Sequence, residues 1–242
     1  LTHIINSTLF KTRSYQFSIT SLSIFFILPG IAGFFVQFPV IEAGFDLANA
    51  LLLLKDPTVL FAGLTLFFYV GMESSFINWL PKIGSEVLAS SGEAPDDNTE
   101  ARSMKVLSIF AVFLMIGRLI ASQVPSITAQ GEWYIIGASI LAAGIIVALR
   151  QTKSLQTTRF LAAAAGFTFA PIFPTTVGIT FAQYDPHVYG SIFGILGAIG
   201  LFGAVVAPKS LGVLAQNSSV QKSLYFLLPA CGILIILAYI IG

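Results

Sequence analysis

The chain has few charged residues. Lys, Arg, Asp and Glu make up 10% of its 242 residues, whereas hydrophobic residues make up 56%. A soluble domain carries roughly a quarter charged residues, so this composition excludes an ordinary soluble protein and indicates an integral membrane protein. The formal net charge of +1 gives no electrostatic basis for binding nucleic acid. We therefore expect the lipid bilayer to be a partner of the chain, and nucleic acid to be none.

Cysteine and histidine are almost absent. The single cysteine, Cys231, excludes an intramolecular disulfide and a metal cluster built from cysteines. Both histidines, His3 and His187, fall in polar segments outside the apolar runs. An intramembrane protease needs an acid pair, a His-Glu-x-x-His motif or a serine–histidine pair at depth, and the sequence offers none of these. We expect no cofactor, no metal site and no enzymatic activity.

Seven apolar segments are each close to the ~20 residues that cross a bilayer as a helix. Their predicted bounds are 17–40, 57–82, 103–124, 132–149, 160–182, 188–207 and 224–241. Residues 1–16 form a polar tail, residues 41–56 include a short amphipathic segment expected at the membrane interface, and residues 83–102 form the longest polar loop. The predicted fold class is an all-α integral membrane helix bundle with about seven transmembrane helices. We divide it into residues 1–56, with the tail, one span and a linker, and a six-helix part at 57–242.

The second span, residues 57–82, contains one acid, Glu73, well inside it. A carboxylate at bilayer depth is costly unless it faces protein or water, so Glu73 is the first candidate functional residue. The alternative, that Glu73 snorkels from the edge of a shorter span, is disfavoured because the apolar run continues past it. Helical spacing places Tyr69 one turn before Glu73 and Asn78 on the same part of the helix, while Trp79 is typical of an interfacial position. Our hypothesis is that Glu73 changes protonation or binds a solute hydroxyl.

Arg118, in the third span, is the other charged residue inside a span. Adjacent spans run antiparallel, so Pro57 and Val124 are expected at the same membrane face. At 1.5 Å per residue this places Glu73 ~24 Å and Arg118 ~9 Å from that face, ~15 Å apart in depth. The sequence therefore predicts no direct ion pair between them. We expect Arg118 to act as a gate or a brace that reaches the turn holding Asp185, or the carbonyls ending a neighbouring helix.

The fifth span contains two prolines, Pro171 and Pro174. They remove backbone donors inside the membrane, which is tolerated beside protein or a wet cavity. Broken helices of this kind hold the binding sites of transporters, so Thr168, Thr175 and Thr176 become candidates for a cavity wall. A structural kink without a binding role is the alternative.

The sixth span carries glycines at three- and four-residue steps, continued by alanines. The predicted packing positions in this stripe are Gly190, Gly194 and Gly197, followed by Gly200 and Gly203. A smooth stripe lets another helix approach closely. It fits either ordinary static packing or a surface that slides during transport.

These motifs occur in an order that resembles one transporter family. They are LLKDPTVLFAGLTLFFYVGMESSFINWL, then FLMIGRLIAS, then GFTFAPIFPTTVGITF, then GSIFGILGAIGLFGAVVAPKSLGVLA. Their order resembles the C-terminal half of a major facilitator superfamily transporter, closest to the fucose-permease-like sugar:proton symporters, over residues 55–242. The resemblance implies that residues 17–40 are the sixth helix of that fold, residues 41–56 the linker between its halves, and the rest helices seven to twelve.

The resemblance also implies a function: secondary active transport of a small solute by alternating access, with a proton-coupled sugar as the first expectation. It implies that Glu73, Asn78 and Trp79 line the cavity and that Arg118 lies at an inner gate. Because the family's first five helices are absent and the chain starts at Leu1, we expect a partial transporter whose partner is a separate N-terminal half. The expected location is the cell membrane, as a multi-pass protein, and the inner membrane in a bacterium.

Two alternatives to this interpretation are a non-transporting scaffold or assembly subunit, and a retinal-binding receptor. The receptor is disfavoured because it needs a lysine inside a span, and Lys222 lies only at the edge of the last one. A scaffold has no use for Glu73 or for the interrupted fifth span. The basic loop residues gather at one face, against only Lys55 at the other, so the positive-inside rule makes that face cytoplasmic, whereas the family order makes it external.

Overall fold

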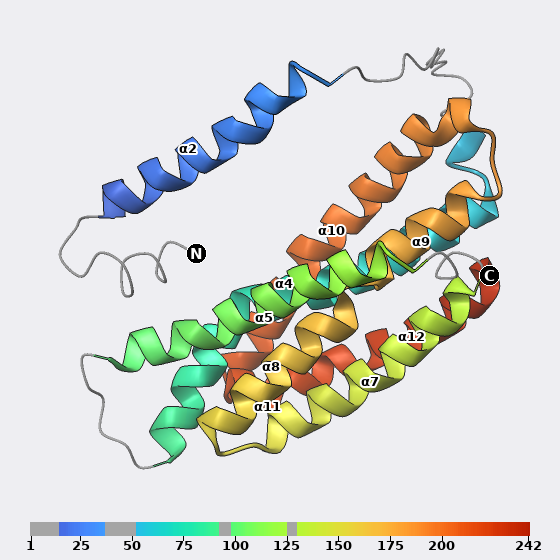
Figure 1. The fold of residues 1–242 in the computed structure, drawn as a ribbon. Helices are drawn as coiled ribbons and strands as arrows, with labels where there is room; N and C mark the ends of the chain where they lie inside the picture. Colours follow the sequence, from blue (N-terminus) through green and yellow to red (C-terminus); the bar gives the residue numbers. More distant parts are fainter. Residues whose placement is uncertain (1–14, 37–51, 92–97, 125–129) are drawn as a thin grey trace. The chain divides into compact units, whose positions relative to one another are not determined.

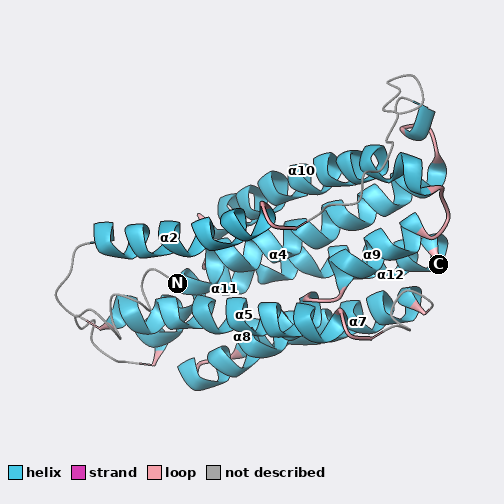
Figure 2. Cartoon of the chain, turned by 45° about the horizontal axis from the view of Figure 1, so that its top comes forward, coloured by secondary structure: helices cyan, strands magenta, loops and turns pink. Residues whose placement is uncertain are grey.

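A computed structural model describes residues 15–36, 52–91, 98–124 and 130–242 of the chain (Figure 1). All regular secondary structure among these residues is helical, which confirms the predicted all-α class (Figure 2). The chain divides into two compact units, Leu1–Glu42 and Ala43–Gly242. We describe each unit by itself.

The first unit contains one described helix, α2 (Tyr15–Gly33), whose apolar part is Ile19–Gly33. Five consecutive large hydrophobic residues, 24–28, are each more than half exposed, so the helix has no polar side to turn toward water. The helix continues through Pro29 and ends at Gly33. The predicted end of this span and most of the predicted interfacial segment at 41–56 lie outside the described residues.

The second unit contains six helical segments that are long and apolar enough to cross a membrane, counted over the described residues. Four of them are built on α4 (Pro57–Ser90), α5 (Thr99–Ala121), α7 (Gly131–Gln151) and α10 (Tyr189–Ala215), the last preceded by η2 (Pro186–Val188). The other two are composite: α8 (Leu155–Phe169) with α9 (Ile172–Phe181), and α11 (Val220–Ser223) with η3 (Leu224–Leu227) and α12 (Leu228–Ile241). The chain is thus a multi-pass membrane protein.

Helix α4 is longer than the sequence predicted. A polar loop was expected from residue 83 to 102, but α4 continues through Pro81 and ends at Ser90. Pro81 removes one backbone donor, and that loss is offset because Ile83 and Val87 beyond it are fully buried. Apolar burial thus extends the helix past the membrane-length segment.

Helices α4 and α10 pack closely because glycine removes side chains where their backbones meet. Gly203 of α10 lies against the backbone of Phe67, and Gly71 of α4 lies against Gly203 and Ala207. A Cβ atom at Gly203 would overlap the Phe67 carbonyl group, so a larger residue there requires the two helices to move apart. These glycine contacts help to make α10 the main neighbour of α4, the helix that carries Glu73.

The three glycines that the sequence selected, Gly190, Gly194 and Gly197, pack against nothing in the described part of the chain. No atom there lies within 4 Å of the position that a Cβ would take. The close contacts are made by Gly200 and Gly203 instead. A three-residue step falls about 60° short of a full helical turn, so the stripe drifts from one face of α10 to the next. The earlier glycines form an open surface.

Helix α10 also continues past the predicted end of its span. The span was predicted to end at residue 207, but the helix continues through Pro208 to Ala215. The Trp79 indole of α4 donates a hydrogen bond to the Pro208 carbonyl oxygen at 3.0 Å, and its ring lies against Gly212. This contact ties α4 to the far half of α10 and supports the helix beyond the proline.

A polar clamp, formed by Glu86 and Gln221, joins the ends of α4, α7 and α11. The two Glu86 carboxylate oxygens accept hydrogen bonds from the backbone N–H groups of Val220 at 3.0 Å and Gln221 at 2.9 Å. The Gln221 side-chain amide donates to the carbonyl oxygens of Leu149 at 2.8 Å and Thr152 at 2.6 Å. The clamp therefore satisfies backbone groups that helix ends leave unpaired.

We predict that Glu86→Ala destabilises the fold by about 1–3 kcal/mol, because two charge-assisted hydrogen bonds are lost at once. Glu86→Gln keeps one acceptor oxygen and should lose about half as much. Denaturant unfolding in mixed micelles measures the change, with Glu100→Ala as the control, since Glu100 is exposed at the start of α5. Equal stability of the Glu86→Ala and Glu100→Ala proteins would show that the clamp contributes nothing.

Candidate functional site

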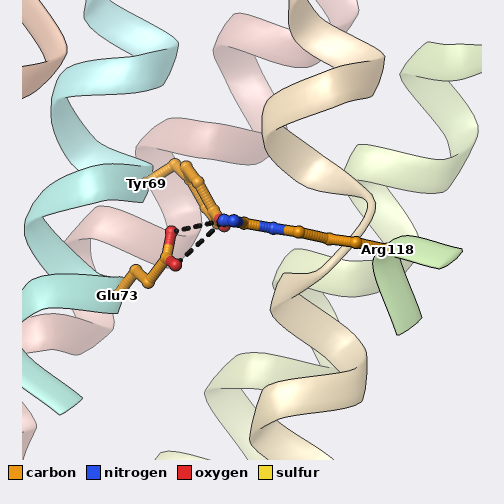
Figure 3. A network of polar contacts seen from close by, with 3 residues as sticks. All are labelled: Tyr69, Glu73 and Arg118. Atoms are coloured by element: carbon orange, nitrogen blue, oxygen red, sulfur yellow. Dashed lines mark hydrogen bonds and ion pairs between the residues drawn. The ribbon is translucent and has the colours of Figure 1, made fainter. Parts of the chain in front are cut away.

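Glu73, Tyr69 and Arg118 form a polar cluster within the membrane-spanning helices (Figure 3). Arg118 Nη2 donates to Glu73 Oε1 at 3.0 Å and to Oε2 at 3.3 Å, which forms an ion pair. The same nitrogen lies 3.5 Å from the Tyr69 hydroxyl oxygen. The Glu73 side chain is 12% exposed and Tyr69 is fully buried, whereas Arg118 is 46% exposed. The anion is therefore enclosed and the cation lies at the edge of the cluster.

The register of α4 and α5 brings these residues together. The helices run antiparallel, and the ring centres of Phe76 and Phe110 lie 5.8 Å apart at one point of contact. Arg118 lies eight residues after Phe110, so its level on α4 is about eight residues before Phe76, close to Tyr69. From there the long Arg118 side chain reaches Glu73, one turn further along α4.

This ion pair shows that the predicted separation in depth was wrong. The prediction assumed that α4 begins and α5 ends at the same level, represented by Pro57 and Val124. In the structure α5 ends at Ala121, and the ring contact that sets the register places this end several residues inside the start of α4. Arg118 is therefore deeper than counting from Val124 suggested, and it is the partner of Glu73.

Over the described residues, Arg118 forms its hydrogen bonds and its ion pair with Tyr69 and Glu73, and none with the turn that holds Asp185. Asp185 is exposed and precedes η2 without a side-chain capping bond. Tyr184, next to Asp185 in this turn, is partly buried, and burial, with a smaller contribution from the Asp56 carboxylate, raises the pKa of Tyr184 to about 12. Tyr184 therefore stays neutral and remains a donor at physiological pH, and a gating role for Asp185 stays a prediction.

Asn78 and Trp79 lie apart from the Glu73 cluster. They line an open hollow of about 560 Å³ between α4 and α5, together with Pro81, Lys82, Ser85, Thr99, Glu100, Ser103 and Met104. The Asn78 side-chain amide donates to the Ser74 carbonyl oxygen at 2.7 Å. Asn78 and Trp79 thus lie in a different part of α4 from Glu73, closer to its C-terminal end, and their role in a transport cavity stays a prediction.

The fifth span is interrupted between α8 and α9. Helix α8 ends at Phe169 and α9 begins at Ile172, with Ala170 and Pro171 between them. Pro174 falls in the first turn of α9, where a missing N–H needs no helical partner. The proline spacing thus produces a short turn rather than a loss of helix.

The threonines beside this interruption are mostly buried. Thr175 and Thr176 are fully buried, and Thr168 is half-buried. The Thr176 hydroxyl donates to the Ile172 carbonyl oxygen at 2.8 Å, whereas Thr175 Oγ1 has no hydrogen-bond partner in the described parts of the chain. A buried hydroxyl without a partner is unusual in a settled core. Their role in a cavity wall stays a prediction.

The six apolar helical segments of the second unit define a helical membrane protein, and comparison with known proteins identifies its fold. No known protein-family profile matches the chain, and no curated protein sequence matches it. Solved structures do match: the chain has the fold of one half of a major facilitator superfamily transporter.

Two of these structures are crystal structures of FucP. The first, a variant of the E. coli fucose:proton symporter, aligns with a TM-score of 0.69 and 16% identity over 94% of this chain and 54% of that one. The second, described as a major facilitator superfamily transporter in the outward conformation, gives a TM-score of 0.66 and 14% identity with the same coverage. The chain spans about half the length of these structures. The predicted resemblance is confirmed at the level of the fold.

Proposed function

We propose that the chain forms one half of a secondary active transporter, which moves a small solute across the membrane by alternating access and couples it to protons through Glu73. The observation that carries this proposal is the ion pair between Glu73 and Arg118 at membrane depth. Ionised groups there are costly, and apolar packing alone would hold the bundle together. Such groups mark solute and ion pathways in membrane proteins.

The exposure of Arg118 supports this proposal. An ionised guanidinium that is 46% exposed at this depth is costly against lipid, so it is expected to face another protein surface or water. The open glycine surface of α10, formed by Gly190, Gly194 and Gly197, similarly allows another helix to pack closely against it. Both features fit a second half packed across a solute cavity. In transporters of this fold the site lies between two halves that move against each other.

A sugar is the first solute class to consider. One structural neighbour is a fucose:proton symporter, which couples a sugar to a proton. In this chain, Glu73, Arg118 and Tyr69 together offer acceptors and donors that suit hydroxyl groups. Asn78 would extend this polar lining along α4.

Reconstitution tests the proposal. We expect the purified chain in liposomes to show no saturable uptake by itself, and to gain pH-driven uptake when the first five helices of the fold are supplied in trans. Radiolabelled sugars and sugar acids across an imposed pH gradient provide the measurement. Uptake by the chain alone would contradict the need for a second half, whereas no uptake in either preparation would favour a scaffold.

A further inference from the structure

We propose that the transported solute is a monocarboxylate, that its carboxylate binds Arg118, and that it crosses the membrane together with one proton carried by Glu73. This inference rests on the proposed function and names the substrate class and the stoichiometry of the same site. It is argued from the hydrogen bonds of Arg118, from the charge of the cluster and from the surroundings of Glu73.

Arg118 uses only part of its hydrogen-bonding capacity. All of its bonds within the described residues come from Nη2, which serves both Glu73 oxygens and the Tyr69 hydroxyl. A guanidinium carries five N–H donors in a planar fork, so those on Nε and Nη1 are left for another ligand. The side chain is also nearly half exposed, which leaves this edge accessible. A carboxylate is the group whose two oxygens match that fork.

The charge of the cluster sets the stoichiometry. With Glu73 ionised and Arg118 protonated, the pair is neutral. Adding a proton with a neutral solute would leave one positive charge at membrane depth, and adding an anion alone would leave one negative charge. Adding one proton and one monocarboxylate keeps the cluster neutral, and it avoids the cost of an unpaired charge in a medium of low dielectric constant.

Among the described residues, no other charged group forms an ion pair with Glu73 or Arg118. The groups that face the Glu73 carboxylate are Tyr69 from its own helix and Arg118 from α5. Helices α8, α9, α10, α11 and α12 also pack against α4, and over their described residues none forms a hydrogen bond or an ion pair with Glu73. One proton and one monocarboxylate add charges to the site that compensate each other.

The transport step balances as follows in atoms and charge. A proton from water adds to one Glu73 oxygen, and the carboxyl group that forms binds Arg118 less strongly than the carboxylate did. The solute carboxylate then takes two N–H bonds from the Arg118 fork. After the site opens to the other side, the solute leaves, Glu73 returns its proton to water, and the ion pair forms again. No covalent bond other than the O–H bond is made or broken.

Uptake by the reconstituted two-half transporter tests the substrate class. The probes are galacturonate and lactate, compared with galactose and fucose; galacturonate differs from galactose in a carboxylate that replaces a hydroxymethyl group. We expect an inward pH gradient to drive uptake of at least one acid. An inside-negative potential of about 60 mV should leave that uptake unchanged, whereas it would raise accumulation of a single positive charge about tenfold.

Three results separate this inference from the proposed function. If the membrane potential stimulates uptake of a neutral sugar, the inference that the substrate is a monocarboxylate is overturned, and the proposal of proton-coupled transport stands. If a sugar is taken up and neither acid is, the substrate class is likewise overturned and proton-coupled transport stands. No pH-driven uptake of any probe would overturn both.

Variants of the two charged residues test the site itself through binding of galacturonate to the purified protein. If one proton is taken up when galacturonate binds, wild-type affinity should fall about tenfold for each unit by which the pH is raised. Glu73→Gln frees Arg118 and should bind at least tenfold more tightly at pH 8, without pH dependence. The double variant Glu73→Gln with Arg118→Gln removes both charges together, so it should fold and lose binding. Lys105→Gln, at an exposed position on the same helix as Arg118, should bind as the wild type does. Undiminished binding by the double variant would overturn the proposal.

Discussion

Replacing Glu73 with glutamine should abolish pH-driven accumulation of solute while solute exchange across the membrane continues. The amide keeps the size of the side chain and an oxygen that can accept from Arg118 Nη2, which now lies 3.0 Å from Glu73 Oε1. It can neither gain nor lose a proton near neutral pH. One proton crossing a gradient of one pH unit releases about 1.4 kcal/mol, enough for about tenfold accumulation of solute. The variant should therefore only equilibrate its solute.

The measurement compares uptake against a pH gradient with counterflow, in which labelled solute exchanges for unlabelled solute without a gradient. A loss confined to the gradient-driven uptake indicates lost coupling, whereas loss of both indicates a damaged site or fold. Glu100→Gln is the matched control, because it makes the same chemical change at an exposed carboxylate outside the cluster. Full pH-driven accumulation by the Glu73→Gln protein would remove Glu73 from the coupling mechanism.

Replacing Gly203 with alanine should destabilise the fold by about 1–3 kcal/mol, as overpacking does in a closely packed interior. The added Cβ would overlap the Phe67 carbonyl group, which belongs to backbone and cannot rotate away. Alanine is otherwise favoured over glycine inside a helix, so helix propensity acts in the opposite direction. A net loss of stability would therefore show that the close contact between α4 and α10 limits the size of the residue at position 203.

Gly190→Ala is the control for this prediction, since no described atom lies within 4 Å of its added Cβ. We expect its unfolding in mixed micelles to match or slightly exceed the stability of the wild type, because of helix propensity alone. Association with a second half should weaken instead, if the open surface of α10 is where that half packs. A Gly203→Ala protein as stable as Gly190→Ala would mean that α4 and α10 separate easily.

The sequence predicts the helix bundle well because the bilayer imposes a length and a composition on each span. It predicts helix ends poorly. Two spans were predicted to end at residues 82 and 207, next to Pro81 and Pro208, yet both helices continue further. The backbone bond that a proline removes is offset by neighbouring contacts, such as the bond from Trp79 to the Pro208 carbonyl oxygen. The polar clamp at Glu86 was missed for the same reason, because its position was assigned to a loop.

The candidate site shows the same division. Glu73 and Arg118 were recognised from their charge inside apolar segments, which a single sequence displays directly. Their contact was excluded because register between two helices depends on tertiary packing, here on the ring contact of Phe76 with Phe110. The packing prediction for the glycine stripe was wrong for a related reason. Repeated three-residue steps move the glycines around the surface of α10, so they do not all face the same neighbouring helix. Pairing the two opposite charges within the apolar segments before fixing the helix levels would have found the ion pair.

The most direct measurement of the central claim is the proton movement that accompanies solute entry. Proteoliposomes with the chain and its second half are suspended in weak buffer, and solute is added outside while external pH is recorded. We predict an external rise in pH with wild-type protein and none with the Glu73→Gln protein. Solute uptake by the wild type without a pH change, or an equal pH change with the variant, would contradict coupling through Glu73 and Arg118.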